Sequence, residues 1–284
     1  MEGPLVGAVV AQLVLGLLFP GAGSAPAVSY VALGDSYTAA PGLLDPVPGS
    51  PPLCTRSAQN YPHRLAAATG WELTDVSCAS AATAHMTTAQ YADQPPQFDA
   101  LSARTRVVSY QAGGNDRNLF QTMVLTCSAL NAGNVGAVGA PCRDSQGSRF
   151  SDDIAAGEPA MGAAIGRIRE LAPHARVYVV GYPAVLPEAG HCYPQMPLST
   201  GDVDYARGIE QELNAALRRQ AEANGAIYVD IYTSAIGHDA CRDPASRWVE
   251  PVLPAQANAT PVHPNAAGQQ ATAEILRAAV TAPG

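Results

Sequence analysis

The chain has 284 residues, 47% of them hydrophobic, so it can bury a substantial core, and its length favours one large domain. Its formal net charge at pH 7 is −8, and all 16 basic residues are arginines, which are scattered without a cluster. A nucleic-acid-binding surface needs a basic patch or stripe, so this composition argues against nucleic acid as a partner.

The N-terminal residues have the pattern of a secretory signal peptide. An apolar stretch over residues 5–19 is followed by the small residues 24–27. The region before it contains Glu2 and no Lys or Arg. The alternative is a membrane anchor, but the stretch is shorter than the roughly 20 apolar residues that span a bilayer. We therefore expect residues 1–27 to be a signal peptide and residues 28–284 to form one exported domain.

Short apolar segments alternate with helical patterns along the rest of the chain. In chain order we expect a strand over 29–33, a helix over 60–69, strands over 72–78 and 106–112, a helix over 160–171, a strand over 176–181, a helix over 203–224, a strand over 226–232 and a helix over 265–280. The clearest helix is 203–224, where apolar residues recur every three or four positions and Gly225 follows as a C-cap. This alternation predicts a parallel sheet with helices on both faces.

Two stretches fall outside this alternation and are expected to be surface loops. Residues 41–52 are rich in proline, and residues 131–147 are rich in glycine and alanine. Each follows a candidate catalytic segment, and loops of this length are often functional. We expect both stretches to form walls of a substrate cleft. For the second stretch, the alternative is an ordinary solvent-exposed loop.

The first candidate catalytic segment is Gly34-Asp35-Ser36, directly behind the apolar run 30–33. This position is the carboxyl end of the first strand, where open α/β sheets bind ligands. Such a tripeptide also occurs in ordinary turns. We predict that Ser36 is a nucleophile and that Asp35 fixes the turn by accepting backbone hydrogen bonds. A serine hydroxyl needs a nearby base to take its proton.

The candidate base is His263, which lies in His263-Pro264-Asn265 before the last helix. A histidine with an ordinary pKa near 6.5 is largely neutral at pH 7 and can accept a proton. For the other five histidines we expect surface or structural roles. These are His63, His85, His174, His191 and His238.

A third segment, Gly113-Gly114-Asn115-Asp116, follows the strand 106–112. Ester cleavage passes through an oxyanion that fixed hydrogen-bond donors stabilise. Asn115 is the candidate side-chain donor, and an ordinary asparagine in a turn is the alternative. We expect Asp116 to fix the turn or helix start. A pair of carboxylates can indicate glycoside hydrolysis, but that chemistry would leave Ser36 and His263 without a role.

In this order, the three segments resemble the SGNH (GDSL) hydrolase family, in particular its secreted actinomycete lipases and esterases. The resemblance covers residues 29–280 and implies a three-layer α/β/α sandwich with a five-stranded parallel sheet of the flavodoxin-like type. It also implies that Ser36 and His263 are catalytic, and that the Ser36 N–H shares the oxyanion hole with Asn115 and with a backbone N–H of the second strand-loop junction.

The chain departs from the family pattern at two positions. Aligned through Cys78, the usual oxyanion-hole glycine is replaced by Ser80, and serine tolerates a positive φ reluctantly. Members of the family often carry Asp three residues before the catalytic histidine, where this chain has Thr260. We therefore expect a dyad in which the backbone carbonyl of Thr260 orients His263. The alternative is a triad completed by Asp239 or Asp243.

The six cysteines contain no Cys-x-x-Cys pair, which argues against zinc knuckles and thioredoxin-like redox chemistry. In an exported chain they indicate disulfides, and 15 connectivities are possible. The resemblance implies sequential pairing, namely Cys54 with Cys78, Cys127 with Cys142, and Cys192 with Cys241.

Together these observations predict a secreted, monomeric serine esterase or lipase that forms an acyl-Ser36 intermediate and needs no metal or organic cofactor. Its partners are expected to be small-molecule or lipid esters. Phospholipase A and carbohydrate deacetylase are alternatives on the same scaffold. A catalytically inactive cell-wall or lipid-binding module is the alternative of another class, and the serine at position 80 favours it slightly.

Overall fold

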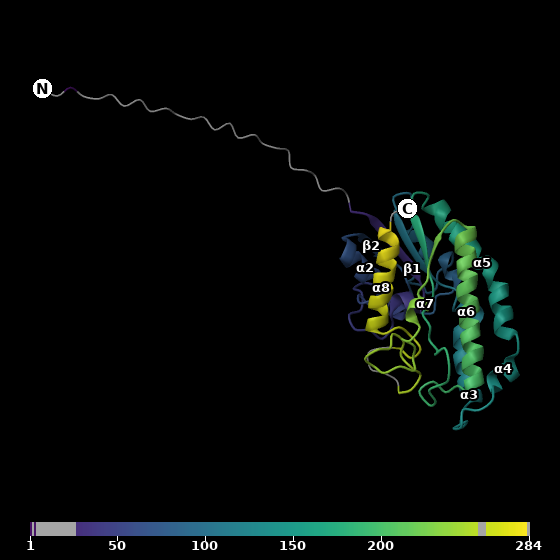
Figure 1. Ribbon diagram of the computed structural model, residues 1–284. Coiled ribbons are helices and arrows are strands. Elements are labelled where there is room, and N and C mark those ends of the chain that lie inside the picture. The colour runs from purple at the N-terminus through teal and green to yellow at the C-terminus, as the bar shows by residue number, and fades with distance from the viewer. Residues whose placement is uncertain (2, 4–26, 255–259, 283–284) are drawn as a thin grey trace.

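The structure is a computed structural model that describes residues 1, 3, 27–254 and 260–282. The expected signal peptide therefore lies almost entirely outside the described residues. The chain forms a five-stranded parallel sheet in the order β2-β1-β3-β4-β5, the doubly wound order of flavodoxin-like folds (Figure 1). The strands are β1 (Ser29–Gly34), β2 (Glu72–Asp75), β3 (Val107–Gln111), β4 (Arg176–Val180) and β5 (Ile227–Val229). The predicted fold class is confirmed.

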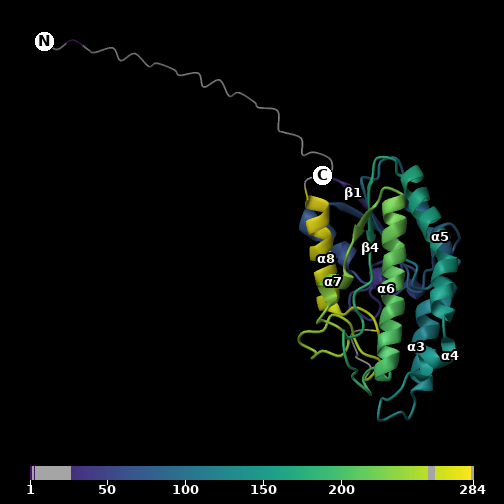
Figure 2. The same cartoon turned by 45° about the vertical axis from the view of Figure 1, so that its right-hand side comes forward.

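Helices cover both faces of the sheet, as the two views of the ribbon show (Figures 1 and 2). The α-helices are α1 (Ser36–Ala39), α2 (Tyr61–Thr69), α3 (Leu119–Leu130), α4 (Pro141–Gln146), α5 (Arg149–Leu171), α6 (Thr200–Ala223), α7 (Tyr232–Ala235) and α8 (Ala266–Thr281). Alternate residues of β1 point to opposite faces. Tyr30 and Ala32 pack with α2 and α8, while Val31 and Leu33 pack with α3, α5 and α6.

The structure differs from the sequence prediction mainly on the α3–α6 side. Helix α3 was not expected, and α4 lies inside the stretch expected to be a loop. Helix α5 begins at Arg149 rather than at residue 160, because Pro159 is accommodated inside it. β2 ends at Asp75, whose Oδ1 accepts the Ser77 N–H at 2.9 Å and turns the chain out of the sheet.

The strand order brings two predicted catalytic segments together at one edge of the sheet. β1 lies between β2 and β3, and Gly34 pairs with Gln111 in the parallel register. The Asp35 N–H extends this pairing to the Gln111 carbonyl at 3.0 Å. The loops after β1 and β3 therefore leave the sheet side by side, at the reversal of strand order where such folds bind ligands.

Three disulfides tie the loops around the sheet. They are Cys54–Cys78, Cys127–Cys142 and Cys192–Cys241, the sequential pairs that the family resemblance implied. Each joins segments outside the strands.

Candidate active site

The turn that carries Ser36 is built by close backbone packing. A Cβ at position 34 would lie 2.1 Å from the Thr38 Oγ1, so only glycine fits there. Asp35 caps α1, because its Oδ1 accepts the Tyr37 N–H at 2.9 Å. Ser36 is thereby fixed as the first residue of the helix, with a side chain that is buried but lines a cavity.

The loop before α8 brings His263 to this serine. The Ser36 Oγ lies 2.8 Å from the His263 Nε2. Asn265 caps α8 by accepting the N–H groups of Ala267 and Gly268, both at 3.0 Å. The His-Pro-Asn sequence therefore places the imidazole at a fixed distance from the start of the helix.

The other ring nitrogen of His263 selects the tautomer. Its Nδ1 lies 2.8 Å from the Pro261 carbonyl, which can only accept a hydrogen bond. The proton therefore sits on Nδ1, and Nε2 is left to accept the Ser36 hydroxyl proton. Burial lowers the pKa of His263, which keeps the imidazole neutral at pH 7.

Three residues that line the cavity beside His263 carry hydrogen-bond donors. The backbone N–H groups of Ser36 and Ser80 have no acceptor within the described part of the chain. The Asn115 Nδ2 donates one hydrogen bond to the Ala81 carbonyl at 3.1 Å, which orients the amide and leaves its second N–H available. Ser36, Ser80 and Asn115 line the same cavity as His263.

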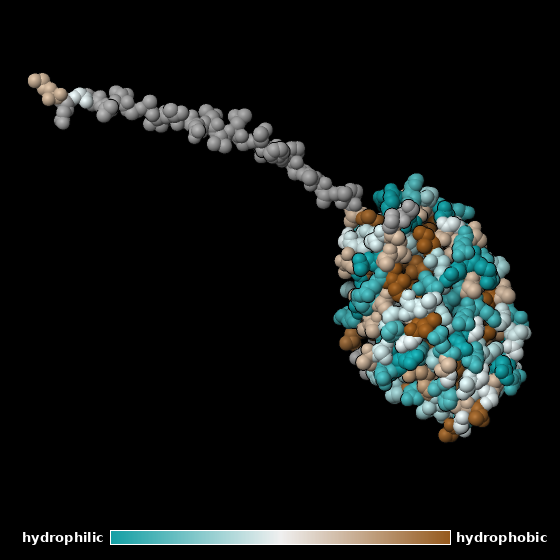
Figure 3. All heavy atoms as spheres, in the orientation of Figure 1, coloured by the Kyte–Doolittle hydropathy of each residue, from teal (hydrophilic) through white to brown (hydrophobic). Residues whose placement is uncertain are grey.

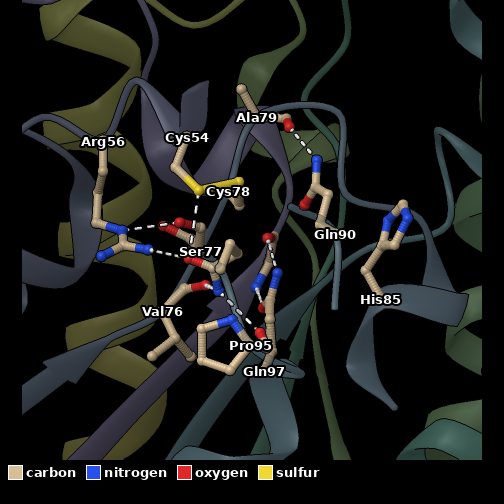
Figure 4. The surroundings of a disulfide bond; sticks show 12 residues. Cys54, Arg56, Val76, Ser77, Cys78, Ala79, His85, Gln90, Pro95 and Gln97 are labelled. Atoms are coloured by element: carbon tan, nitrogen blue, oxygen red, sulfur yellow. Dashed lines mark hydrogen bonds between the residues drawn. A yellow bond between two sulfur atoms is a disulfide. The ribbon is translucent and has the colours of Figure 1, made fainter. Parts of the chain in front are cut away.

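The backbone of Ser80 is strained. The glycine that the family usually has at this position would adopt the same conformation freely. The φ of Ser80 is +63°, a value that L-residues other than glycine rarely adopt. The loop is held from both sides, by the Cys54–Cys78 disulfide and by Gln90, whose Nε2 donates to the Ala79 carbonyl at 2.7 Å (Figure 4). These contacts fix the direction of the Ser80 N–H.

A buried hydrogen-bond chain links the nucleophile turn to the Gly-Gly-Asn loop. The Tyr182 hydroxyl donates to the Asp35 Oδ2 at 2.5 Å and accepts the Gly114 N–H at 2.9 Å. Burial raises the pKa of Asp35 to about 7, although the hydrogen bond from Tyr182 opposes the shift. Asp35 therefore positions backbone on two loops. In the described residues its carboxylate accepts hydrogen bonds from Tyr37 and Tyr182, and none from His263.

Asp116 connects a third loop to this arrangement. Its carboxylate accepts the Thr83 N–H and the Thr83 hydroxyl, both at 2.7 Å. It was expected to fix its own turn or helix start, but it holds the 83–86 turn against the Gly-Gly-Asn loop. Burial raises the pKa of Asp116.

A largely apolar cavity of about 510 Å³ opens beside Ser36 and His263. One wall is α3, and another is formed by α6 and the segment after β4. The apolar side chains of these walls include Phe120, Met123, Leu125, Leu186, Met196 and Leu198. In the described ranges, no group of three or more His, Cys, Asp or Glu residues could hold a metal ion, and no helix is long and apolar enough to cross a membrane.

The chain matches the GDSL-like lipase/acylhydrolase family over residues 32–271. It is also 45% identical over 275 residues to Lipase 2 of Streptomyces coelicolor, covering 94% of this chain and 92% of the relative. The chain belongs to this GDSL-like family. It is an ester hydrolase, as the order of its three motifs predicted.

Solved structures agree with the GDSL-like assignment. Phospholipase A1 from Streptomyces albidoflavus superposes with a TM-score of 0.73 at 27% identity, covering 90% of this chain and all of that one. The extracellular lipase from Streptomyces rimosus superposes with a TM-score of 0.72 at 27% identity, covering 89% of this chain and all of that one.

The expected role of Thr260 is wrong. Its carbonyl accepts the backbone N–H of His263 at 3.2 Å, and the imidazole Nδ1 contacts the Pro261 carbonyl instead. Residues 260–263 form a turn with proline second and Val262 third, at a φ of +61°. In such a turn the carbonyl of the second residue is free of the turn hydrogen bond, so Pro261 is available to the ring.

No carboxylate in the described residues accepts a hydrogen bond from His263. Asp239, one candidate for a triad, accepts the Cys241 N–H at 3.0 Å and pairs with Arg242 at 3.1 Å. The carboxylate of the other candidate, Asp243, has no hydrogen-bond or ion-pair partner within the described ranges, and so does not contact His263. In the described residues, His263 therefore contacts the Ser36 hydroxyl and a backbone carbonyl, and no carboxylate.

Several residues at the site were missed because they lie outside the three motifs. Gln97 bonds both the N–H and the carbonyl of Gly34, at 2.8 and 2.9 Å, and thus holds the end of β1. Tyr182 follows β4, and Glu210 lies on α6 among apolar residues. The buried position of Glu210 within the periodic apolar stripe of its helix is a detectable signal; nothing in the local sequence distinguishes Gln97.

Proposed function

We propose that the protein is a secreted serine esterase or lipase in which Ser36 is the nucleophile and His263 the base. The 2.8 Å contact between the Ser36 Oγ and the His263 Nε2, at the wall of an apolar cavity, carries this proposal. Export is supported by three disulfides. It is also supported by the similarity to the extracellular lipase from S. rimosus.

In this mechanism His263 takes the hydroxyl proton as the Ser36 Oγ attacks the ester carbonyl. The resulting oxyanion receives hydrogen bonds from the Ser36 N–H, the Ser80 N–H and the Asn115 amide. His263 then protonates the leaving alkoxide, which gives the alcohol and an acyl-Ser36 ester. Water, deprotonated by His263, then attacks this ester; the bond between the acyl carbon and the Ser36 Oγ breaks, His263 returns the proton to the Oγ, and the carboxylic acid is released.

The cavity favours esters with an apolar acyl chain. Its lining is mainly aliphatic and aromatic, and its volume exceeds what an acetyl group fills. This argues against a carbohydrate deacetylase. The phospholipase A alternative is supported by the similarity to phospholipase A1 from S. albidoflavus. An inactive module is disfavoured, because the serine, the histidine and three donors all face one cavity.

The test is hydrolysis of p-nitrophenyl esters from acetate to palmitate, with phosphatidylcholine as a second substrate. We expect kcat/KM to rise from acetate to medium-length chains, and Ser36→Ala to abolish turnover without a change in Tm. Hydrolysis of acetate alone would favour a deacetylase. Absence of hydrolysis of every ester by the folded protein would favour the inactive module.

A further inference from the structure

Most of the exposed large hydrophobic side chains lie on segments that line the cavity or continue its walls. Besides Met1, the described part of the chain exposes nine large hydrophobic side chains. Six of them lie on segments that also line the cavity or directly continue its walls. We define these six as the apolar rim: Leu44, Leu125, Leu130, Val135, Val138 and Leu253. Scattered single hydrophobic residues are normal on protein surfaces, but such a concentration indicates an interaction site.

The rim is continuous with the cavity. Leu125 lines the cavity and is nevertheless 62% exposed. On another side, the Leu253 N–H donates to the Gln195 carbonyl at 3.0 Å, which places Leu253 beside Met196 of the cavity wall. Leu44 follows Pro41, a further residue of the lining. A surface that covers the rim would therefore also cover the entrance to the active site.

The most exposed part of the rim is held in place by hydrogen bonds. Val135 and Val138 are 79% and 71% exposed on the connection between α3 and α4. The Asn134 Nδ2 donates to the Val138 carbonyl at 2.9 Å, and the Thr200 N–H at the start of α6 donates to the Ala137 carbonyl at 3.1 Å. Figure 3 shows brown side chains at the lower end of the molecule, where Figure 1 places this connection.

The part of the rim on α3 and the α3–α4 connection is uncharged. Residues 119–142 contain no Asp, Glu, Lys or Arg, although the chain carries a net charge of −8. Segments that bind anionic membranes are instead rich in lysine and arginine. An uncharged apolar surface on an acidic protein fits a lipid surface without net charge, because an anionic surface would repel the protein as a whole.

From these observations we propose that the apolar rim docks the enzyme on the surface of an uncharged lipid aggregate and presents the cavity to its ester substrates. This proposal rests on the proposed function, because the cavity must accept lipid esters. The α3–α4 connection would then increase turnover of aggregated lipid by docking the enzyme, without contacting the reacting atoms.

The test compares the double variant Val135→Ser, Val138→Ser with a matched control, Ile227→Ser. Ile227 is 42% exposed at the start of β5, opposite the edge of the sheet that carries the active site. Binding is measured by flotation with phosphatidylcholine vesicles, in a Ser36→Ala background so that the vesicles are not hydrolysed. Turnover of triolein emulsion and of soluble p-nitrophenyl butyrate is measured with Ser36 present.

We expect the double variant to bind vesicles at least tenfold more weakly and to lose a similar factor on triolein emulsion. Its kcat/KM for p-nitrophenyl butyrate should be unchanged, and the control should behave as the parent in all assays. Equal binding by the double variant would overturn the proposal. So would preferential binding to phosphatidylglycerol vesicles, or a dimer that dissociates on substitution of the rim. If the parent binds vesicles but hydrolyses no ester, the proposed function fails and the docking proposal survives.

Discussion

The Tyr37 hydroxyl donates a 2.7 Å hydrogen bond to the backbone carbonyl of Val262. This bond joins the residue after Ser36 to the residue before His263, across 225 positions of the chain. The Tyr37 ring also lies 5.0 Å from the imidazole, centroid to centroid. Because Val262 has a φ of +61°, its backbone is strained and needs such support.

Tyr37→Phe tests the importance of this link. The variant keeps the ring but loses the hydroxyl, so the loop of His263 should become less well oriented. We expect kcat for a soluble ester to fall by about tenfold, since small displacements of a catalytic group are costly, while KM changes little. The measurement is steady-state kinetics together with Tm. An unchanged kcat would show that the turn at 260–263 positions His263 unaided.

Asn115→Ala tests the oxyanion hole. The amide is oriented by the Ala81 carbonyl, and we propose that its second N–H faces the oxyanion, a charge that exists only in the transition state. We expect kcat to fall by roughly 10²–10³ with little change in KM. A rise in KM with kcat intact would instead mean that Asn115 binds the ground-state substrate.

Asp239→Asn tests the dyad. The Asp239 carboxylate is occupied by the Cys241 N–H and Arg242, so we expect most of the activity to remain. Neutralising a true triad aspartate costs about 10⁴-fold in kcat. A loss of that size, with Tm unchanged, would require a carboxylate to reach His263 during turnover.

Glu210 predicts a pH dependence that is specific to long acyl chains. It lines the cavity, only 3% exposed, and its carboxyl oxygens accept only the Val185 N–H among the described residues, at 3.2 and 3.3 Å. Burial raises the pKa of Glu210 to about 8, although the charge of nearby Arg207 lowers it. Burial raises the pKa values of Tyr37 and Tyr232, and the charge of Glu210 adds to both shifts.

An apolar chain in the cavity removes more water from this carboxyl and so favours its neutral form. Affinity for long chains should be full well below pH 8 and should fall as the pH rises through about 8. We expect KM for p-nitrophenyl decanoate to increase by up to about tenfold between pH 7 and pH 9, and KM for the acetate to stay level. Glu210→Gln, which cannot ionise, should flatten the decanoate profile. A rise in the acetate KM as well would assign the titration to another group.

The parallel sheet could be predicted from sequence because β1, β3, β4 and β5 are short apolar segments and the patterns between them are helical, which is local information. β2 is a half-exposed edge strand, and its sequence is mostly polar. Helix α3 was missed. Its residues are apolar on most sides, and the preceding Asn118 has a φ of +59° and provides no side-chain cap, so no start signal marks it. One face of α3 lines the cavity. This arrangement depends on tertiary structure, and the local sequence pattern does not reveal it.

At the site, too, the residues in short motifs could be predicted, and the residues that act across long sequence separations could not. Ser36, His263 and Asn115 lie in short motifs, and the positive φ at Ser80 follows from its alignment with a glycine. The choice between the carbonyls of Thr260 and Pro261 depended on the geometry of one turn. Tyr182 and Gln97 act across more than 60 residues of sequence, so no local pattern could reveal their hydrogen bonds.

Covalent labelling identifies the nucleophile directly. The protein is treated with diethyl p-nitrophenyl phosphate, and the modified peptide is identified by mass spectrometry alongside the residual ester hydrolysis. We predict a single diethylphosphoryl group on Ser36, bound at the same rate at which activity is lost, and no labelling of the folded Ser36→Ala variant. A label on another residue, or substantial hydrolysis by Ser36→Ala, would contradict the account.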